Sequence, residues 1–305
     1  HGPILIILTI FWLFDRLVFF FPPEFPTPFL LFFFQNAFVF SLIPLLIWTL
    51  TKYRKTDASS DNWLFILSLP LFLISKIFIL KAGSFDLGWM MTIGLFRLAL
   101  LIMLERTLTQ FIKATFQTHL FRNKWLDGTI KIAAFIGVFA FALPSFISST
   151  LFAFIGSLLL IRFFLWSPRL GFQRLDIGIM YYGYLGLVFH FFLESSRIKG
   201  QLNTVGDIST HSFTLWSMGL IIPAMLIRIS MGHTGRKIIF TAWDKAALRF
   251  SAIGGLVRIV FPQIWPRAYS IWILIAALCW TLCYSILAVH LIPFLLKPRV
   301  DGKEH

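Results

Sequence analysis

The chain has 305 residues, of which 58% are hydrophobic and only 13% are charged, and its mean hydropathy is +0.83. That is too little polar surface to cover a soluble globule, so the composition excludes an ordinary soluble domain and predicts a polytopic membrane protein. The formal net charge is +14. In a membrane protein, the positions of the basic residues in the connections indicate orientation, and we expect no nucleic-acid partner.

Long apolar runs divide the chain at charged or turn-rich breaks. Each has roughly the 20 residues that a helix needs to cross about 30 Å of hydrocarbon. The runs are continuous rather than alternating, which favours helices over barrel strands. We predict an all-α membrane bundle in a single domain (1–305) with a short basic tail (298–305). Its ten helices, in chain order, are residues 2–22, 27–50, 63–80, 87–104, 127–148, 149–167, 177–195, 207–231, 241–262 and 266–297.

The first run begins directly after His1 and has no cleavage site of the signal-peptide type. We therefore expect an N-terminally incomplete or processed piece of a longer protein.

Lysine and arginine are distributed unequally between alternate connections. One set of connections, with the C-terminal tail, holds fourteen: Lys52, Arg54, Lys55, Arg106, Lys113, Arg122, Lys124, Arg169, Arg174, Arg236, Lys237, Lys297, Arg299 and Lys303. The other set holds four: Lys81, Arg197, Lys199 and Arg267. By the positive-inside rule, the first set and both chain ends are predicted to be cytoplasmic.

One basic connection has apolar residues at helical spacing, opposite Lys113 and Arg122. They are Leu108, Phe111, Ile112, Phe116 and Leu120. This pattern predicts a helix lying on the inner membrane surface, with an irregular basic loop as the alternative.

Several charges fall inside the predicted spans, where each needs a partner, a cavity or a function. Arg97 lies in the middle of the fourth span. Lys76 and Lys131 lie nearer helix ends and are expected to snorkel, and Asp15 is expected to pair with its neighbour Arg16.

The histidines are candidate ligands for iron or copper. The predicted topology places His190 and His211 near the outer face, and His233 and His290 near the inner face. His190 and His211 could ligate haem together if their helices pack antiparallel. The alternative, and the commoner case, is a buried histidine that bonds to a backbone carbonyl.

Cys279 and Cys283 are four residues apart and share one helix face. Two thiolates so placed suit Cu(I), although small residues in a packed membrane helix need no metal to explain them.

The stretch RISMGHTGRKI (228–238) places Arg228, His233 and Arg236 around a glycine-rich turn. Guanidinium groups beside such a turn could bind a haem propionate, a lipid phosphate or a substrate carboxylate. The alternative is a solvated basic loop.

Residues 211–238, HSFTLWSMGLIIPAMLIRISMGHTGRKI, resemble the hallmark segment of the NnrS family of bacterial inner-membrane proteins. Further resemblance lies in the tail KPRVDGK (297–303), in Arg106, in Arg258, and in the segment 162–190 through Arg162, Trp166, Gly183 and Tyr184. The chain lacks the N-terminal histidine segment of the family, H-x-H-E-M. It also has Tyr181 and Tyr182 where the family often has a histidine.

The resemblance implies a haem- and copper-associated inner-membrane protein of the nitric oxide response, which protects from nitrosative stress. Expected partners are the lipid bilayer, haem and nitric oxide, and no particular protein partner is predicted. The implied cofactor-binding residues are His190, His211, Arg228, His233 and Arg236. The implied metal ligands are His190, His211, His233 and His290. Cys279 and Cys283 are candidate ligands from their spacing alone.

Two other functions remain open from the sequence, and so does the question of catalysis. A secondary transporter for an organic anion could use Arg97, Arg228 and Arg258 as counter-charges, although no internal repeat supports it. A lipid-modifying enzyme would need a carboxylate cluster for Mg²⁺. Asp176, Glu194 and Asp207 are scattered across different connections, which makes this the weakest alternative.

Overall fold

A computed structural model describes residues 2–20, 28–52 and 62–302 of the chain, and within these ranges it contains helices and no strands. The all-α prediction is confirmed. The contacts group into two compact units, His1–Ile102 and Met103–His305, which are described separately, and helix α4 runs through the division. The single-domain organisation stays a prediction.

The first unit contains α1 (Gly2–Leu17), α2 (Pro28–Lys52), α3 (Asn62–Leu80) and the first half of α4 (Phe85–Phe116). Asp15 is buried in α1 and forms an ion pair with Lys76 of α3, with 2.6 Å between Oδ2 and Nζ. The expectation that Asp15 pairs with Arg16 and that Lys76 snorkels is therefore wrong. The cation comes from another helix, a pairing that sequence neighbours could not indicate.

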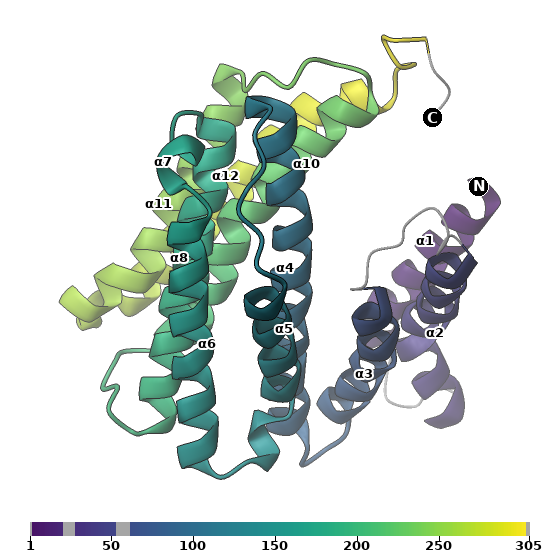
Figure 1. Cartoon of the computed structure of the whole chain (residues 1–305). Coiled ribbons are helices and arrows are strands. Elements are labelled where there is room, and N and C mark those ends of the chain that lie inside the picture. Colours follow the sequence, from purple (N-terminus) through teal and green to yellow (C-terminus); the bar gives the residue numbers. More distant parts are fainter. Residues whose placement is uncertain (1, 21–27, 53–61, 303–305) are drawn as a thin grey trace. The chain divides into compact units, whose positions relative to one another are not determined.

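The second unit holds the remaining helices (Figure 1). The C-terminal ends of α4 and α10 and the N-terminal end of α8 lie at the same end of this unit, which we call the inner end; the opposite end is the outer end. The helices are α5 (Lys124–Val138), α6 (Ser145–Leu165), α7 (Pro168–Gly171), α8 (Leu175–Ile198), α9 (Ile208–His211), the π-helical segment η3 (Ser212–Met218), α10 (Gly219–His233), α11 (Ala242–Ile264) and α12 (Tyr269–Leu295).

Eight helical stretches in the described ranges are long and apolar enough to cross a membrane, which makes the chain a multi-pass membrane protein. Two of the ten predicted spans fall short. Helix α5 has 15 residues, or about 22 Å at 1.5 Å per residue. Helix α1 has 16 residues, and part of the predicted span 2–22 lies outside the described residues. The cytoplasmic position of the chain ends stays a prediction.

Two predicted boundaries differ from the structure. The break between the fifth and sixth spans falls at Pro144 rather than between residues 148 and 149, because proline forces the preceding Leu143 into an extended conformation and α6 starts directly after it. The predicted surface helix is the end of α4, which continues unbroken to Phe116. Its apolar residues Leu108 and Ile112 are buried, so they pack inside the protein.

Candidate functional site

Five charged side chains meet inside the second unit, and we call them the inner network: Glu105, Arg122, Asp127, Lys131 and Arg162. Glu105 lies at the centre. It accepts hydrogen bonds from Arg122, from Lys131 at 3.2 Å and from Arg162 at 3.1 Å. Asp127 accepts a bond of 2.7 Å from Nε of Arg122. The carboxylates come from α4 and α5, so the network joins these helices to α6.

Arg162 is almost completely enclosed, with 1% of its surface exposed. Its Nε donates to the hydroxyl of Tyr184 at 2.9 Å, and that hydroxyl donates to the carbonyl of Leu159. The guanidinium also lies 4.6 Å from the ring centroid of Trp166. Since Tyr184 lies about 14 Å from the start of α8 at 1.5 Å per residue, these contacts are at membrane depth.

Arg122 reaches the inner network from a segment without helical structure. Residues 117–123 connect α4 to α5, and in Figure 1 they run back along the end of α4. Leu120 of this segment is buried, while the Arg122 side chain is 41% exposed. Irregular backbone at such a depth is tolerated where protein covers it. Arg122 lies in a connection, as predicted, and it also helps to close the charge network. The cytoplasmic position of this connection stays a prediction.

Asp176 and Arg228 form a second buried pair at the inner end. Arg228 Nη1 donates to Asp176 across 52 residues of sequence, and both side chains are at least 95% buried. Arg174 also donates to Asp176, at 3.0 and 3.2 Å. The Arg228 guanidinium stacks 4.1 Å from the ring centroid of Phe111. Arg228, a predicted cofactor-binding residue, is therefore placed as a structural ion-pair partner between α8 and α10.

The GHTGR turn and the C-terminal tail contact each other. Gly235 has a φ of +73° and lies against Asp301, so close that a Cβ at this position would be 2.7 Å from the carboxyl carbon. The backbone N–H of Val300 donates to the carbonyl of Thr234 at 3.1 Å. Arg299 forms an ion pair with Asp301. The two motifs, far apart in sequence, are thus one structural feature.

The other two predicted residues of this turn differ in their surroundings. His233 is exposed. Arg236 packs over the ring of Phe294, 4.5 Å from its centroid, and its Nη1 is buried without a hydrogen-bond acceptor in the described part of the chain.

At the outer end, four residues form what we call the outer cluster: His190, Glu194, Arg197 and Ser209. The His190 ring is fully buried, and its Nδ1 lies 2.7 Å from the Ser209 carbonyl oxygen. The Ser209 hydroxyl donates to Glu194 at 2.6 Å, and Glu194 pairs with Arg197 one turn further along α8. Because a carbonyl oxygen only accepts, Nδ1 of His190 carries a proton and donates it to Ser209.

His211 lies two residues after Ser209 and is half-buried. Residues two apart point to nearly opposite sides of a helix, so His211 does not share the Ser209 face that His190 contacts. The charged groups that act on His211 are Arg258 and Asp207. Arg258 in turn donates to the hydroxyl of Tyr269 at 2.8 Å.

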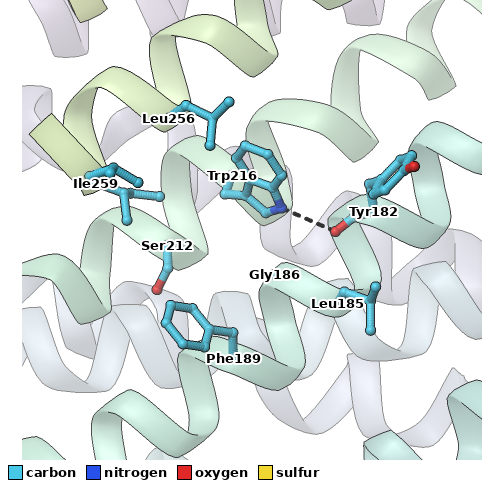
Figure 2. Close-up of a pocket in the computed structure, with 9 residues that line it drawn as sticks. Tyr182, Leu185, Gly186, Phe189, Ser212, Trp216, Leu256 and Ile259 are labelled. Atoms are coloured by element: carbon cyan, nitrogen blue, oxygen red, sulfur yellow. Dashed lines mark hydrogen bonds between the residues drawn. The ribbon is translucent and has the colours of Figure 1, made fainter.

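The π-helical segment Ser212–Met218 follows His211 directly and borders an apolar groove of about 300 Å³ (Figure 2). Gly186 of α8 lines this groove. A side chain at this position would collide with the Trp216 ring. Trp216 Nε1 donates to the Tyr182 carbonyl at 3.1 Å. A π-helical turn is rare and often occurs at a functional position. Its place directly after His211 favours a functional role for this region.

The last two groups of predicted ligands lie on α12. Nδ1 of His290 is 3.0 Å from Asp244 Oδ1.

Cys279 and Cys283 form no disulfide and are buried. The Cys279 Cβ would lie 2.9 Å from a Cβ built on Gly254 of α11. This close approach supports the packing interpretation of the cysteines.

Comparison with known families places these motifs in a wider context. A family model described as NnrS protein matches residues 1–299. The chain belongs to the NnrS family. No curated protein and no solved structure matches it.

This NnrS chain does not assemble the predicted metal ligands into one group. Among the described residues, no three histidine, cysteine or acidic side chains lie close enough together to hold a metal ion. His190 and His211 face different partners, and His233 and His290 lie on separate elements. Haem ligation needs one or two imidazoles rather than three ligands, so the individual histidines stay predictions.

The inner network is what the sequence analysis of this NnrS chain missed. No role was predicted for Glu105, and Lys131 was predicted to snorkel although it bonds to Glu105. One signal was available: Glu105 lies at the end of a predicted span and is next to Arg106, which belongs to the family resemblance. An acidic residue within or beside a membrane span is expected to have a charged partner or a function, and Glu105 is such a residue.

Proposed function

We propose that this chain is a bacterial inner-membrane protein of the nitric oxide response, which binds haem and copper and protects from nitrosative stress. The observation that carries the proposal is the family match, which extends over residues 1–299. Eight membrane-spanning candidates agree with an integral membrane location. The proposal concerns binding and makes no claim of catalysis.

His190 has the donor chemistry that an axial haem ligand needs. A metal-ligating histidine usually gives its other ring N–H to a carbonyl or carboxylate, which fixes the tautomer and the ring orientation. Nδ1 of His190 bonds to the Ser209 carbonyl in this way, and Ser209 is itself held by Glu194. Haem iron, when bound, would supply a coordination position for nitric oxide.

His211 is the second proposed ligand, and Arg258 lies close enough to act on its charge. A guanidinium there could pair with a haem propionate. The fit is weaker than for His190, because nothing in the described residues orients the His211 ring.

Copper fits His290 better than it fits the cysteines. His290 Nδ1 bonds to the Asp244 carboxylate, which leaves Nε2 as the donor. Cys279 is pressed against Gly254, so a metal between the two thiolates would require α11 and α12 to separate.

Optical spectra of the purified protein, air-oxidised and dithionite-reduced, together with metal analysis, test the proposal. Cells are supplied with haem, and His190→Ala is compared with His211→Ala. His119→Ala serves as the matched control, because His119 is exposed in the connection 117–123. We expect a Soret band that shifts on reduction, is lost in His190→Ala and persists in the control. A folded, haem-supplied protein without a Soret band contradicts haem binding.

The structure does not favour the transporter alternative. Two of its three proposed counter-charges are engaged: Arg228 pairs with Asp176, and Arg258 donates to Tyr269. Arg97, the third, is buried and has an interaction of its own. A substrate anion would have to compete with Asp176 for Arg228 and with Tyr269 for Arg258.

A further inference from the structure

One nitrogen of the Arg162 guanidinium has no hydrogen-bond partner within the part of the chain that the structure describes. Its Nε donates to Tyr184, and its Nη1 donates to Glu105 at 3.1 Å and lies 3.5 Å from Asp127. Its Nη2 is buried and has no hydrogen-bond acceptor among the described residues. Arginine stays protonated in proteins, so this nitrogen keeps two charged N–H donors at a position that is only 1% exposed.

An unpaired charged donor in a protein interior is costly, so a further acceptor is expected at Nη2. We propose that Nη2 of Arg162 anchors a binding site for a small monovalent anion. The carboxylates of Glu105 and Asp127 have other partners than Nη2. Glu105 accepts from Nη1 and from Arg122, and Asp127 accepts from Arg122 and lies 3.5 Å from Nη1.

The chemistry of the site restricts the class of anion. Bidentate recognition of a carboxylate or phosphate uses two neighbouring guanidinium nitrogens. Nε and Nη1 of Arg162 are already engaged, so only a single-nitrogen contact is left. The Trp166 ring covers the guanidinium at 4.6 Å. A halide or a small oxyanion fits these limits, and a bulky carboxylate does not.

Arg122 provides the contact between this site and the surroundings. Its side chain is 41% exposed, and it bonds to both carboxylates of the inner network. An incoming anion would meet this exposed cation before the enclosed Arg162. The attraction between the anion and the guanidinium grows as the dielectric constant falls, and it has to exceed the desolvation cost of the anion.

Isothermal titration calorimetry of the full chain in detergent tests the proposal. Sodium bromide and sodium nitrite are titrated at constant ionic strength, with sodium gluconate as the bulky anion. We expect one bromide site per chain, competition by nitrite and no binding of gluconate.

Arg162→Lys keeps the positive charge near the carboxylates but removes Nη2. We expect bromide affinity to fall about tenfold to a hundredfold, the effect of losing one hydrogen bond from a charged group. Arg249→Lys is the matched control, because Arg249 is an exposed arginine of α11 outside the inner network, and the bromide affinity of this variant should equal that of the wild type. Gel filtration and far-ultraviolet circular dichroism establish that each variant is folded.

Arg122→Gln keeps Arg162 intact and covers the case in which Arg162→Lys does not fold. Here we expect bromide to bind about tenfold more weakly, because one nearby cation is lost. If the folded wild type does not bind bromide, the proposal is overturned, and a buried water is then the partner of Nη2. An affinity that is unchanged in folded Arg162→Lys or in Arg122→Gln overturns it as well.

Discussion

Buried charge is balanced in different ways at the two ends of the second unit. In the inner network, Glu105 pairs with Arg122, Lys131 and Arg162, which are 17, 26 and 57 residues away in sequence. In the outer cluster, Glu194 pairs with Arg197 within the same helix, and its second partner is the Ser209 hydroxyl. The inner network therefore holds separate elements together, whereas the outer cluster orients one imidazole.

The largest effect is expected from Glu105→Gln. The change leaves Arg162 and Lys131 without their shared carboxylate in a buried position, and breaking such a pair costs about 3–5 kcal/mol. Thermal unfolding of the purified protein in detergent measures it. Asp86→Asn, an exposed acid at the start of α4, is the matched control and should change little. Equal melting temperatures for the two variants would show that the inner network is not a structural centre.

Asp176→Asn should have the next largest effect, about 3 kcal/mol, because Arg228 would become an unpaired buried cation. The comparison variant is Arg174→Gln, which removes the half-exposed partner of the same carboxylate. It should cost less than about 1 kcal/mol, the range of exposed ion pairs. A loss in Arg174→Gln as large as in Asp176→Asn would contradict the assignment of Arg228 as the main partner.

Gly235→Ala should destabilise the protein by about 1–2 kcal/mol, since a residue with a side chain is strained at positive φ and its Cβ would meet Asp301. Gly232→Ala is the control in the same turn. Gly232 lies at the end of α10 with no atom near its Cβ position, so alanine there should be neutral or slightly stabilising. Proteolysis of the tail, followed by mass spectrometry, should be faster in Gly235→Ala alone.

Ser209→Ala should have the smallest effect, about 1 kcal/mol, from the lost hydrogen bond to Glu194. The variant keeps the Ser209 carbonyl that bonds to His190, so any haem spectrum should persist. Ser195→Ala, which loses a buried hydroxyl bond to the Ser149 carbonyl, is its control for stability. If the Soret band disappears in folded Ser209→Ala, the hydroxyl and not the carbonyl holds the ring.

The helical class and most spans could be predicted from sequence, because the runs of apolar residues determine membrane crossing locally. The same holds for the turn at Gly232 and Gly235, whose glycines are visible in the sequence. The partners of buried charges could not be predicted. Because Lys131 lies near a helix end, we predicted that it snorkels, but its ammonium group bonds to Glu105 of another helix.

The histidines show the same limit. Their depth follows from topology, which placed His190 and His211 together at one end. Their direction depends on helix rotation and on the short helix α9, which turns Ser209 rather than His211 toward His190. Rotation is determined by packing between helices, and one sequence without relatives contains little information about it.

The contact between Thr234 and Val300 also has a consequence for biosynthesis. A membrane protein is made from its N-terminus, and its early parts fold first. The GHTGR turn emerges before α11 and α12, but the Thr234 carbonyl accepts from the N–H of Val300, which is made only after both of these helices. The inner end of α10 therefore stays incomplete throughout the insertion of the last two helices.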